Sequence, residues 1–276
     1  MIEKSAQPVS FYRRSDLRPG DSGEALEAFE SLPTTAGPWS PGAQHGGPPA
    51  ALLARAVERL PAADHGRIGR FTMELLGPVP VGPVAVSARV VRPGRSVQLA
   101  AAELHDLARD RVAATAAAWL FPRTPGPGVG PGPLPHTPAD GAEHPRPPAW
   151  HGGYLDAIEW RWVSGGLEVP GTGVVWMRPP ALVEGEPLSP VQRLLACVDS
   201  ASGASAALDV REWGFLNTEL TVHVLREPAG EWVCLDAETT LSDGSVGVAT
   251  SAAYDERGLV ARSAQALLVV PRSVSR

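Results

Sequence analysis

Two glycines and two prolines stand directly before an apolar run with helical spacing, in the segment HGGPPAALLARAVERL (45–60). Proline is tolerated in the first turn of a helix, because the N–H that it lacks has no intrahelical partner there. The backbone N–H groups of Gly46 and Gly47 are then expected at a helix start, where such groups bind anions or a developing oxyanion. We therefore expect His45, Gly46 and Gly47 to contribute to a substrate-binding site, although His45 also suits a packing role at a helix entry.

Other familiar kinds of catalytic site have no pattern in this sequence. His45, Gly46 and Gly47 are similar to the HGG oxyanion loop of esterases. The nucleophile elbow G-x-S-x-G is absent, however, which argues against an α/β-hydrolase. The seven histidines show no metal-ligand spacing, and the glycines of the proline-rich stretch precede no helix that would complete a phosphate loop. We expect neither a metal nor a cofactor. Cys197 and Cys234 form no C-x-x-C pair and have apolar neighbours, as buried free thiols of a reducing compartment do.

Composition and charge narrow the class of protein. The chain has 276 residues, of which 43% are hydrophobic and 20% are charged, as in a globular protein. The net charge is −6, and no basic cluster contains interleaved aromatic residues, so we expect no nucleic-acid partner. The first residues, MIEKSAQPVSFYRRSD, lack the apolar core of a secretory signal, and no stretch approaches the roughly 18 apolar residues of a membrane helix. These features predict a cytoplasmic protein without a membrane partner.

A proline-rich segment, residues 123–150, divides the chain into two parts that can be aligned with each other. The segment lacks apolar periodicity and is expected to be an extended linker. Residues 67–123 align with residues 216–272 at a shift of 149 without a gap, and Thr72 then matches Thr221. The alignment indicates a structural duplication.

Each part has the same order of predicted elements. A helix is predicted over residues 46–60 and another over residues 189–203, where a serine–proline pair supplies a side-chain cap and a first-turn proline. Each helix precedes β-rich runs that are separated by tight turns. A helix followed by an antiparallel meander is the pattern of the hotdog fold, in which a curved sheet wraps a long helix. We therefore predict an α+β double hotdog, with an N-terminal unit and its leader at residues 1–122 and a C-terminal unit at residues 151–276.

Two long segments of the chain carry a resemblance to a known family. The segment PWSPGAQHGGPPAALLARAVE, with RFTMELLGPVPVGP after it, resembles the N-terminal hotdog of thioesterase-like proteins related to the type II acyl-CoA thioesterases. The segment PVQRLLACVDSASG, with FLNTELTVHVLREPAGEWVCLDAET and YDERGLVARSAQALLV after it, resembles their C-terminal hotdog. The resemblance covers residues 35–122 and 150–272. It implies cofactor-free hydrolysis of an acyl thioester, with acyl-CoA or an acyl group on a protein-bound pantetheine as the substrate.

The resemblance also implies a set of catalytic residues. In the type II thioesterases an aspartate, a threonine and a glutamine hold and activate the hydrolytic water, and these positions fall on Asp199, Asn217 and Gln265. Asparagine in place of threonine departs from the family pattern, and the neighbouring Thr218 is the alternative for that role. In such a site Asp199 would take a proton from water while the two amides orient that water.

The internal repeat tests this assignment independently of the family. A shift of 149 aligns the strands, and a shift of 141 aligns the two helices through their prolines. The residues of the first copy that match Asp199, Asn217 and Gln265 are Glu58, Ile68 and Ala116. Two of the three polar positions are therefore apolar in the first copy, which predicts a single active site in the second.

Each of these residues also has a purely structural interpretation. Asp199 lies late in its helix, where an acid is unfavourable for the helix dipole, and a nearby backbone or arginine partner would explain it. Gln265 interrupts an apolar strand, where an amide often bonds to a neighbouring strand. With regular alternation Asn217 shares the face of Glu219 and His223, opposite the apolar residues, so Asn217 faces the site only if the strand has a bulge or starts late.

Two other functions remain open from the sequence. A hotdog dehydratase, hydratase or pathway-specific tailoring enzyme acts on a thioester intermediate, and a dehydratase needs a His–acid pair in its pocket, for which His223 with Glu219 is the local candidate. A binding protein would keep an acyl-ligand pocket without turnover, and asparagine in place of threonine favours that alternative. We also expect a homo-oligomer, because hotdog units bury sheet edges and helix faces by pairing.

Overall fold

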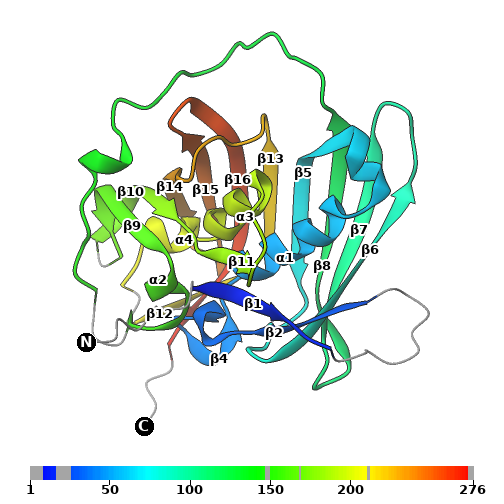
Figure 1. Cartoon of the computed structure of the whole chain (residues 1–276). Coiled ribbons are helices and arrows are strands. Elements are labelled where there is room, and N and C mark those ends of the chain that lie inside the picture. The colour runs from blue at the N-terminus through cyan, green and yellow to red at the C-terminus, as the bar shows by residue number, and fades with distance from the viewer. Residues whose placement is uncertain (1–8, 17–25, 147–149, 168, 210–211, 273–276) are drawn as a thin grey trace, which may run out of the picture.

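Two antiparallel helices, α1 (Gly47–Glu58) and α3 (Pro190–Val198), lie side by side against one large sheet (Figure 1). The structure is a computed structural model that describes residues 9–16, 26–146, 150–167, 169–209 and 212–272. The sheet has fourteen strands and contains both copies of the predicted meander. A helix against an antiparallel meander, found twice, confirms the predicted α+β double hotdog.

The helices begin where the sequence predicts. The Ser189 hydroxyl accepts a hydrogen bond from the Gln192 N–H at 3.1 Å, which caps α3. The second predicted helix is interrupted after Val198, and its last turn forms the separate α4 (Ala201–Ala204). The other short helices and 3-10 turns are α2 (Gly153–Ala157), η1 (Pro33–Thr35), η2 (Pro61–His65) and η3 (Pro138–Asp140).

The strands follow one path across the sheet. From edge to edge the order is β11, β1, β2, β6, β7, β8, β5, β13, β16, β15, β14, β10, β9, with β12 paired to β16. The strands of the first copy and its leader are β1 (Ser10–Arg14), β2 (Glu27–Ser31), β5 (Gly66–Leu75), β6 (Pro83–Arg92), β7 (Gln98–Asp106) and β8 (Arg111–Pro122). Those of the second are β9 (Glu159–Gly166), β10 (Val169–Arg178), β11 (Ala181–Val183), β12 (Trp213–Asn217), β13 (Glu219–Val224), β14 (Val233–Leu241), β15 (Val246–Asp255) and β16 (Gly258–Pro271). A separate two-stranded sheet contains β3 (Ala36–Gly37) and β4 (Ser40–Gln44).

The two copies meet where β5 pairs with β13, in the middle of the sheet (Figure 1). Thr72 lies opposite Thr221, and their hydroxyl oxygens are 3.2 Å apart. The flanking pairs are Phe71 with Val222 and Met73 with Leu220. Because the predicted repeat matches Thr72 to Thr221, equivalent residues pair with each other across this contact. A pseudo-two-fold axis therefore passes through the two threonines.

The sequence predicts a gapless alignment of the two copies, but the structures of the two copies align only with a gap. The turn between β7 and β8 runs from Asp106 to Arg111, whereas the turn between β15 and β16 runs from Asp255 to Gly258. The first copy therefore has two more residues in this turn. The strands after the turn correspond at a different shift from the strands before it.

This difference changes the match of Gln265. The threonines on the pseudo-axis lie opposite Ala117 of β8 in the first copy and Ala264 of β16 in the second. Strand β16 thus corresponds to β8 at a shift of 147, and Gln265 matches Ala118 rather than Ala116. The prediction of Ala116 is wrong by two residues, because a turn tolerates an insertion that sequence identity alone did not reveal. Ala118 is also fully buried, so the first copy is apolar at this position as predicted.

An irregularity separates β12 from β13 at Thr218. Asn217 lies opposite Leu267 and Thr221 lies opposite Ala264, so four residue steps on one strand face three on the other. The extra residue reverses the alternation of side chains at this point. Asn217 therefore faces inward, as the predicted bulge requires.

The first copy has the same irregularity at the same place. The pairing of β5 with β8 shifts between Ile68 and Arg70, at Gly69, which matches Thr218 at a shift of 149. Ile68 faces the core and is 2% exposed. The duplication thus includes the bulge that orients Asn217, and the bulge belongs to the fold rather than to one site.

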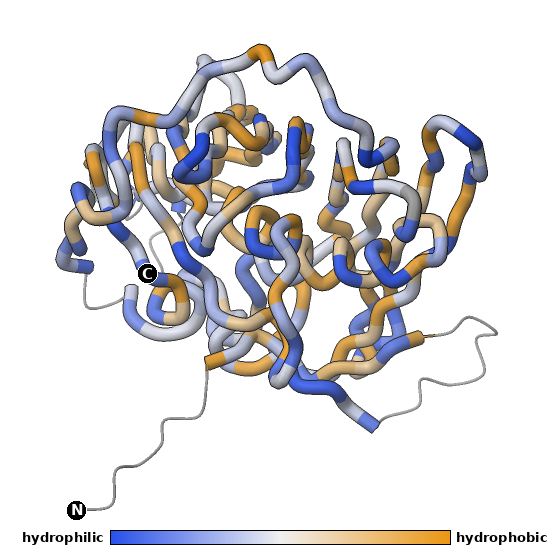
Figure 2. The backbone as a smooth tube through the Cα atoms, turned by 45° about the horizontal axis from the view of Figure 1, so that its top comes forward, coloured by the Kyte–Doolittle hydropathy of each residue, from blue (hydrophilic) through white to orange (hydrophobic). Residues whose placement is uncertain are grey.

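The described residues 123–137 lie in no helix or strand and arch over the molecule from β8 to η3 (Figures 1 and 2). His136 accepts a hydrogen bond from the Trp176 indole N–H at 3.1 Å, and Ala142 forms a bridge with Trp162 of β9. The end of the linker is thus attached to the second copy. The predicted boundaries at residues 122 and 150 stay a prediction, and residues 147–149 lie outside the described part of the chain.

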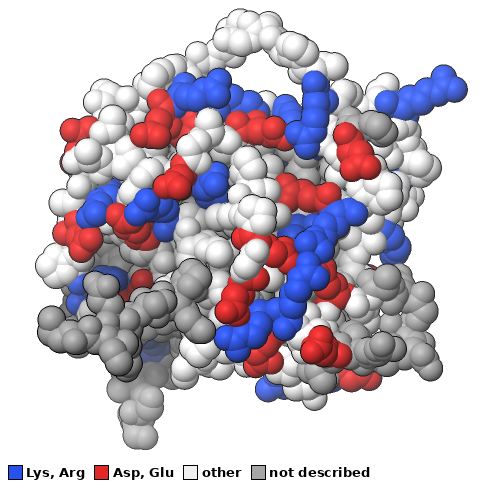
Figure 3. Space-filling view, in the orientation of Figure 1, with Lys and Arg blue, Asp and Glu red and all other residues white. Residues whose placement is uncertain are grey.

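Ion pairs through Arg55 join β2, which precedes α1, to the second copy. Arg55 of α1 is 2% exposed and donates to Glu27 of β2 and to Glu186, which precedes α3. The two carboxylates compensate the desolvation of the guanidinium. Strand β1 also pairs in parallel with β11. On the face shown in Figure 3, basic and acidic side chains likewise lie next to one another.

Candidate active site

Asp199 lies where the end of one central helix meets the start of the other. It is the C-cap of α3 and only 4% exposed, and its carboxylate accepts the Gly46 N–H at the start of α1. A Cβ added to Gly46 would lie 2.7–2.8 Å from the carboxylate, so this approach requires glycine. The acid is unfavourable for the dipole of its own helix but lies at the positive end of the neighbouring helix.

Two side-chain amides converge on one oxygen of Asp199. The Asn217 amide donates to Oδ1 at 2.6 Å, and the Gln265 amide donates to the same oxygen at 2.9 Å. Gln265 also donates to the Asp199 backbone carbonyl at 3.1 Å. The structure thus brings together the three residues that the sequence selected, from α3, β12 and β16.

Gln265 has one polar atom without a partner. The residue is fully buried, and its side-chain oxygen Oε1 accepts no hydrogen bond from the residues that the structure describes. Leaving a buried acceptor unsatisfied costs about 1–3 kcal/mol. This oxygen is therefore an acceptor to which a water molecule or a ligand group can donate.

His45 contacts Asp199 from the first copy. Its Nδ1 lies 3.2 Å from Asp199 Oδ2 and accepts the Gly47 N–H at 3.1 Å. A neutral ring with this acceptor carries its proton on Nε2. A lone pair of Nδ1 and a lone pair of Oδ2 would then face each other unless Asp199 carries a proton on Oδ2. The two residues therefore form a coupled pair although 154 positions separate them in the sequence.

Burial controls the charge of this pair. It raises the pKa of Asp199, against the opposing effects of His45, the Gly46 N–H and the two amides. It also lowers the pKa of His45, against the opposing charge of Asp199. Both effects disfavour the ion pair, and the raised pKa of Asp199 makes its carboxylate a stronger base than an exposed one.

Tyr154 supports His45 and was not selected from the sequence. The two rings are stacked with centroids 3.8 Å apart and planes 1° from parallel. The fully buried Tyr154 hydroxyl donates to the Ala196 carbonyl at 2.7 Å and lies 2.9 Å from the Ser200 hydroxyl. Tyr154 therefore fixes the imidazole plane against the end of α3. No motif in the sequence marks it, because its partners lie about 42 and 109 residues away.

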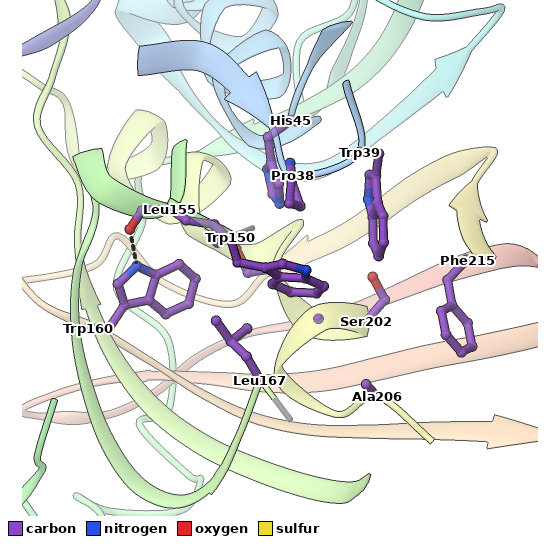
Figure 4. Close-up of a pocket in the computed structure, with 12 residues that line it drawn as sticks. Pro38, Trp39, His45, Trp150, Leu155, Trp160, Leu167, Ser202, Ala206 and Phe215 are labelled. Carbon is purple, nitrogen blue, oxygen red and sulfur yellow. Dashed lines mark hydrogen bonds between the residues drawn. The ribbon is translucent and has the colours of Figure 1, made fainter. Parts of the chain in front are cut away.

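An apolar pocket opens beside His45 (Figure 4). Four aromatic side chains line it from separate parts of the chain: Trp39, Trp150, Trp160 and Phe215. Smaller lining residues include Leu155, Leu167, Ser202 and Ala206.

The opposite end of the helix pair contains the matching acid. Glu58 ends α1 at the start of α3, and its carboxylate accepts the Ser189 hydroxyl at 2.9 Å and the Gln192 amide at 2.7 Å. The predicted match of Asp199 to Glu58 is therefore confirmed by geometry. Ile68 and Ala118 stand where Asn217 and Gln265 stand at the other end.

The structure separates the remaining predicted residues from this cluster. Thr218 is exposed, and its hydroxyl lies 3.4 Å from the Ala266 carbonyl rather than near Asp199. His223 is exposed on the outer face of β13, and the Glu219 carboxylate binds the Ala266 N–H at 2.8 Å. The structure therefore offers His45 with Asp199, not His223 with Glu219, as a His–acid pair beside a pocket.

Two further features are absent from the residues that the structure describes. Among them no three His, Cys, Asp or Glu side chains are grouped so that they could hold a metal ion. Within the same residues no helix is both long and apolar enough to cross a membrane.

Two family models match the chain. The model described as the acyl-CoA thioesterase N-terminal domain matches residues 35–121, and the one described as the acyl-CoA thioesterase C-terminal domain matches residues 138–269. Together they cover most of the sequence. No curated protein matches the sequence.

Solved structures share the fold at low sequence identity. A hotdog-fold protein of unknown function from Alicyclobacillus acidocaldarius is 19% identical, with a TM-score of 0.71 over 90% of this chain and 94% of its own. A putative thioesterase II from Thermobifida fusca is 20% identical, with a TM-score of 0.70 over the same shares. The acyl-CoA thioesterase II TesB2 from Mycobacterium marinum is 15% identical, with a TM-score of 0.62 over 91% and 94%. The chain therefore belongs to the double-hotdog thioesterase-like family that is related to the type II acyl-CoA thioesterases.

Proposed function

We propose that this protein hydrolyses an acyl thioester, with acyl-CoA as the substrate, by means of a water molecule held at Asp199, Gln265 and Asn217. The observation that carries the proposal is the bonding pattern of Gln265. Its amide nitrogen orients Asp199, while its buried oxygen lacks a donor among the described residues. A water molecule that donates one hydrogen to Gln265 Oε1 and the other to Asp199 would satisfy both acceptors.

The reaction follows from this arrangement. Asp199 takes a proton as the water oxygen attacks the thioester carbonyl carbon, which gives a tetrahedral oxyanion. Collapse of that intermediate breaks the carbon–sulfur bond, and the proton held by the pair passes to the departing sulfur. The products are a carboxylic acid and a free thiol. Burial supports this role, because a carboxylate with a raised pKa is a stronger base near neutral pH.

Contrary to the expectation from the sequence, the N–H groups of the two glycines at the start of α1 are not free to bind an oxyanion, because both are bonded within the protein. The Gly46 N–H donates to Asp199, and the Gly47 N–H donates to His45. Both amides therefore position catalytic groups. The Nε2–H of His45, which lines the pocket, is the donor that we propose for the developing oxyanion.

Asn217 replaces the threonine of the family. Its amide donates to Asp199 at 2.6 Å, so it stabilises the ionised carboxylate. Thr218 is not needed for this role in the proposal. Thr218→Ala serves as a control, because the Thr218 side chain is exposed and donates to a β16 carbonyl.

Thiol release from acyl-CoA esters tests the proposal. We expect turnover by the wild-type chain, a large loss in Asp199→Asn and Gln265→Ala, and near wild-type rates in Thr218→Ala. Bound acyl-CoA without thiol release from any ester would show a binding protein instead. Circular dichroism of each variant confirms that it is folded.

One observation favours a second candidate, a dehydratase or hydratase. The buried pair of His45 and Asp199 beside the pocket is the kind of His–acid pair that such chemistry needs. Incubation with 3-hydroxyacyl-CoA separates the two: new absorbance of an enoyl thioester without free thiol would establish the second candidate.

A further inference from the structure

Trp160 and Leu167 line the pocket beside His45, and both also line a second, polar pocket. That second pocket contains the charged Glu143, Arg146 and Asp156. The two side chains thus form a partition between an apolar and a charged space.

The Trp160 half of the partition is held in place. Its indole N–H donates to the Leu155 carbonyl at 2.9 Å, and its ring stacks on Trp162 with centroids 6.1 Å apart. Tyr154, which supports His45, contacts the same ring edge-on at 6.2 Å. Rotation of Trp160 would break three contacts, so the wall is fixed relative to His45. Leu167 is 8% exposed, and its aliphatic side chain forms no hydrogen bond. Leu167 is therefore the residue of the partition to substitute.

The space in front of the partition is small. Its volume is about 50 Å³, whereas an apolar cavity that binds benzene measures roughly 150 Å³. An acyl chain that extended further would have to displace Trp160 or Leu167 and then enter the charged pocket. Burying methylenes there gains little, because the exposed lining of that pocket is mainly polar.

We infer that this site selects short acyl thioesters, of about two to four carbons, and that Trp160 and Leu167 set the limit. The inference rests on the proposed function, because it takes the thioester to lie at His45 with its acyl group in the apolar pocket. Each methylene that fits contributes about a fourfold gain in affinity. The gain ends where the chain meets the partition.

The experiment measures binding rather than turnover, so it does not depend on hydrolysis. S-alkyl-CoA thioethers with ethyl, butyl and octyl chains are titrated into the wild-type chain, Leu167→Ala and Leu182→Ala by calorimetry. Leu182 is a buried leucine of β11 outside the pocket, so its variant controls for general loosening. We expect wild-type affinity to rise from ethyl to butyl and to fall at least tenfold for octyl. Leu167→Ala should restore octyl binding at least tenfold, and Leu182→Ala should leave the profile unchanged.

Affinity that rises from butyl to octyl in the wild-type chain would overturn the inference, as would failure of all three thioethers to bind. The wild-type profile decides this even if Leu167→Ala does not fold. If short thioethers bind with the expected profile but no ester releases thiol, the proposed hydrolysis fails while the length limit stands. If esters of all lengths are hydrolysed equally, the hydrolysis stands and the limit fails.

Discussion

The two ends of the α1–α3 helix pair are built on the same plan and differ in what surrounds them. At each end a carboxylate from one helix lies at the start of the other: Asp199 at α1 and Glu58 at α3. Asp199 is bound by amides from the strands of its own copy, and beside it are His45 and a pocket. Glu58 is bound by a serine and a glutamine of the helix cap, with apolar strand residues in the matching positions.

The comparison indicates that the acid between the helices is a property of the duplicated fold. A carboxylate there satisfies N–H and hydroxyl donors at a helix start, and this structural role applies to both ends. In the proposed mechanism the catalytic property comes from the strands. Asn217 and Gln265 bond to Asp199, and Gln265 Oε1 has no donor among the described residues. The donors to the Glu58 carboxylate are the cap residues Ser189 and Gln192. Among the described residues, no strand amide bonds to Glu58.

Exchange of each acid for its amide should give the largest difference between the two ends. We expect Asp199→Asn to lower kcat/KM for thiol release by about 10³-fold, because the general base is lost. Glu58→Gln should stay within about twofold of wild type. Steady-state kinetics on one acyl-CoA ester measure both. Equal losses in the two variants would show that both ends are catalytic.

Removal of the glutamine at each end comes next in size. Gln265→Ala should lower kcat by about 10²-fold, since the water loses its orientation while Asp199 remains. Gln192→Ala should leave kcat unchanged and lower stability by about 1–2 kcal/mol, because Glu58 loses a donor. Kinetics and urea unfolding of the same samples separate the two effects. A catalytic loss in Gln192→Ala would contradict the assignment of that end to structure alone.

A change at the helix starts should give a smaller effect. Gly46→Ala places a methyl group against the Asp199 carboxylate and should lower kcat/KM by about tenfold. Ser189→Ala removes the cap of α3 and one donor to Glu58, and should lower stability by about 1 kcal/mol without loss of activity. Thermal unfolding and initial rates test both variants. Full activity in Gly46→Ala would show that the close approach of the Gly46 backbone to Asp199 is not required for activity.

The two acids should also differ in how pH acts on them. Burial raises the pKa of both carboxyls. The rate should therefore rise with pH through a pKa above the ordinary 3.9 of aspartate, because the ionised form of Asp199 is the base. At Glu58 a raised folded pKa means that its stabilising contribution is present at low pH and is lost as pH rises through that pKa. Glu58→Gln should flatten the pH dependence of Tm and leave the pH–rate profile unchanged.

Restoration of the family threonine should have the smallest effect. In Asn217→Thr a hydroxyl replaces the amide, which still donates to Asp199, so we expect kcat/KM within about fivefold of wild type. Asn217→Ala removes the donor and should raise the pKa that governs the rate. The pH–rate profiles of both variants provide the measurement. An unchanged profile in Asn217→Ala would exclude Asn217 from the site.

Much of the site was predictable because the sequence resembles a known family and contains an internal repeat. The family resemblance selected Asp199, Asn217 and Gln265, and the structure brings their side chains onto one carboxylate. The alternation over residues 217–224 predicted that Asn217 faces the site only with a bulge or a late strand start, and the register contains a bulge at Thr218. The gapless alignment missed two residues in a turn, because turns accept insertions without a change in the strands that they join.

The sequence by itself determined the duplication, the α+β class, the helix starts and the acid late in α3, because these depend on local spacing and on similarity between the two parts. Only the tertiary structure decided that His45 contacts Asp199, that Tyr154 supports the imidazole, and that Trp39 and Trp150 line the pocket. These residues come from separate segments, and no period or spacing along the chain relates them. The antiparallel packing of α1 on α3 brings them together, since it sets the start of one helix against the end of the other.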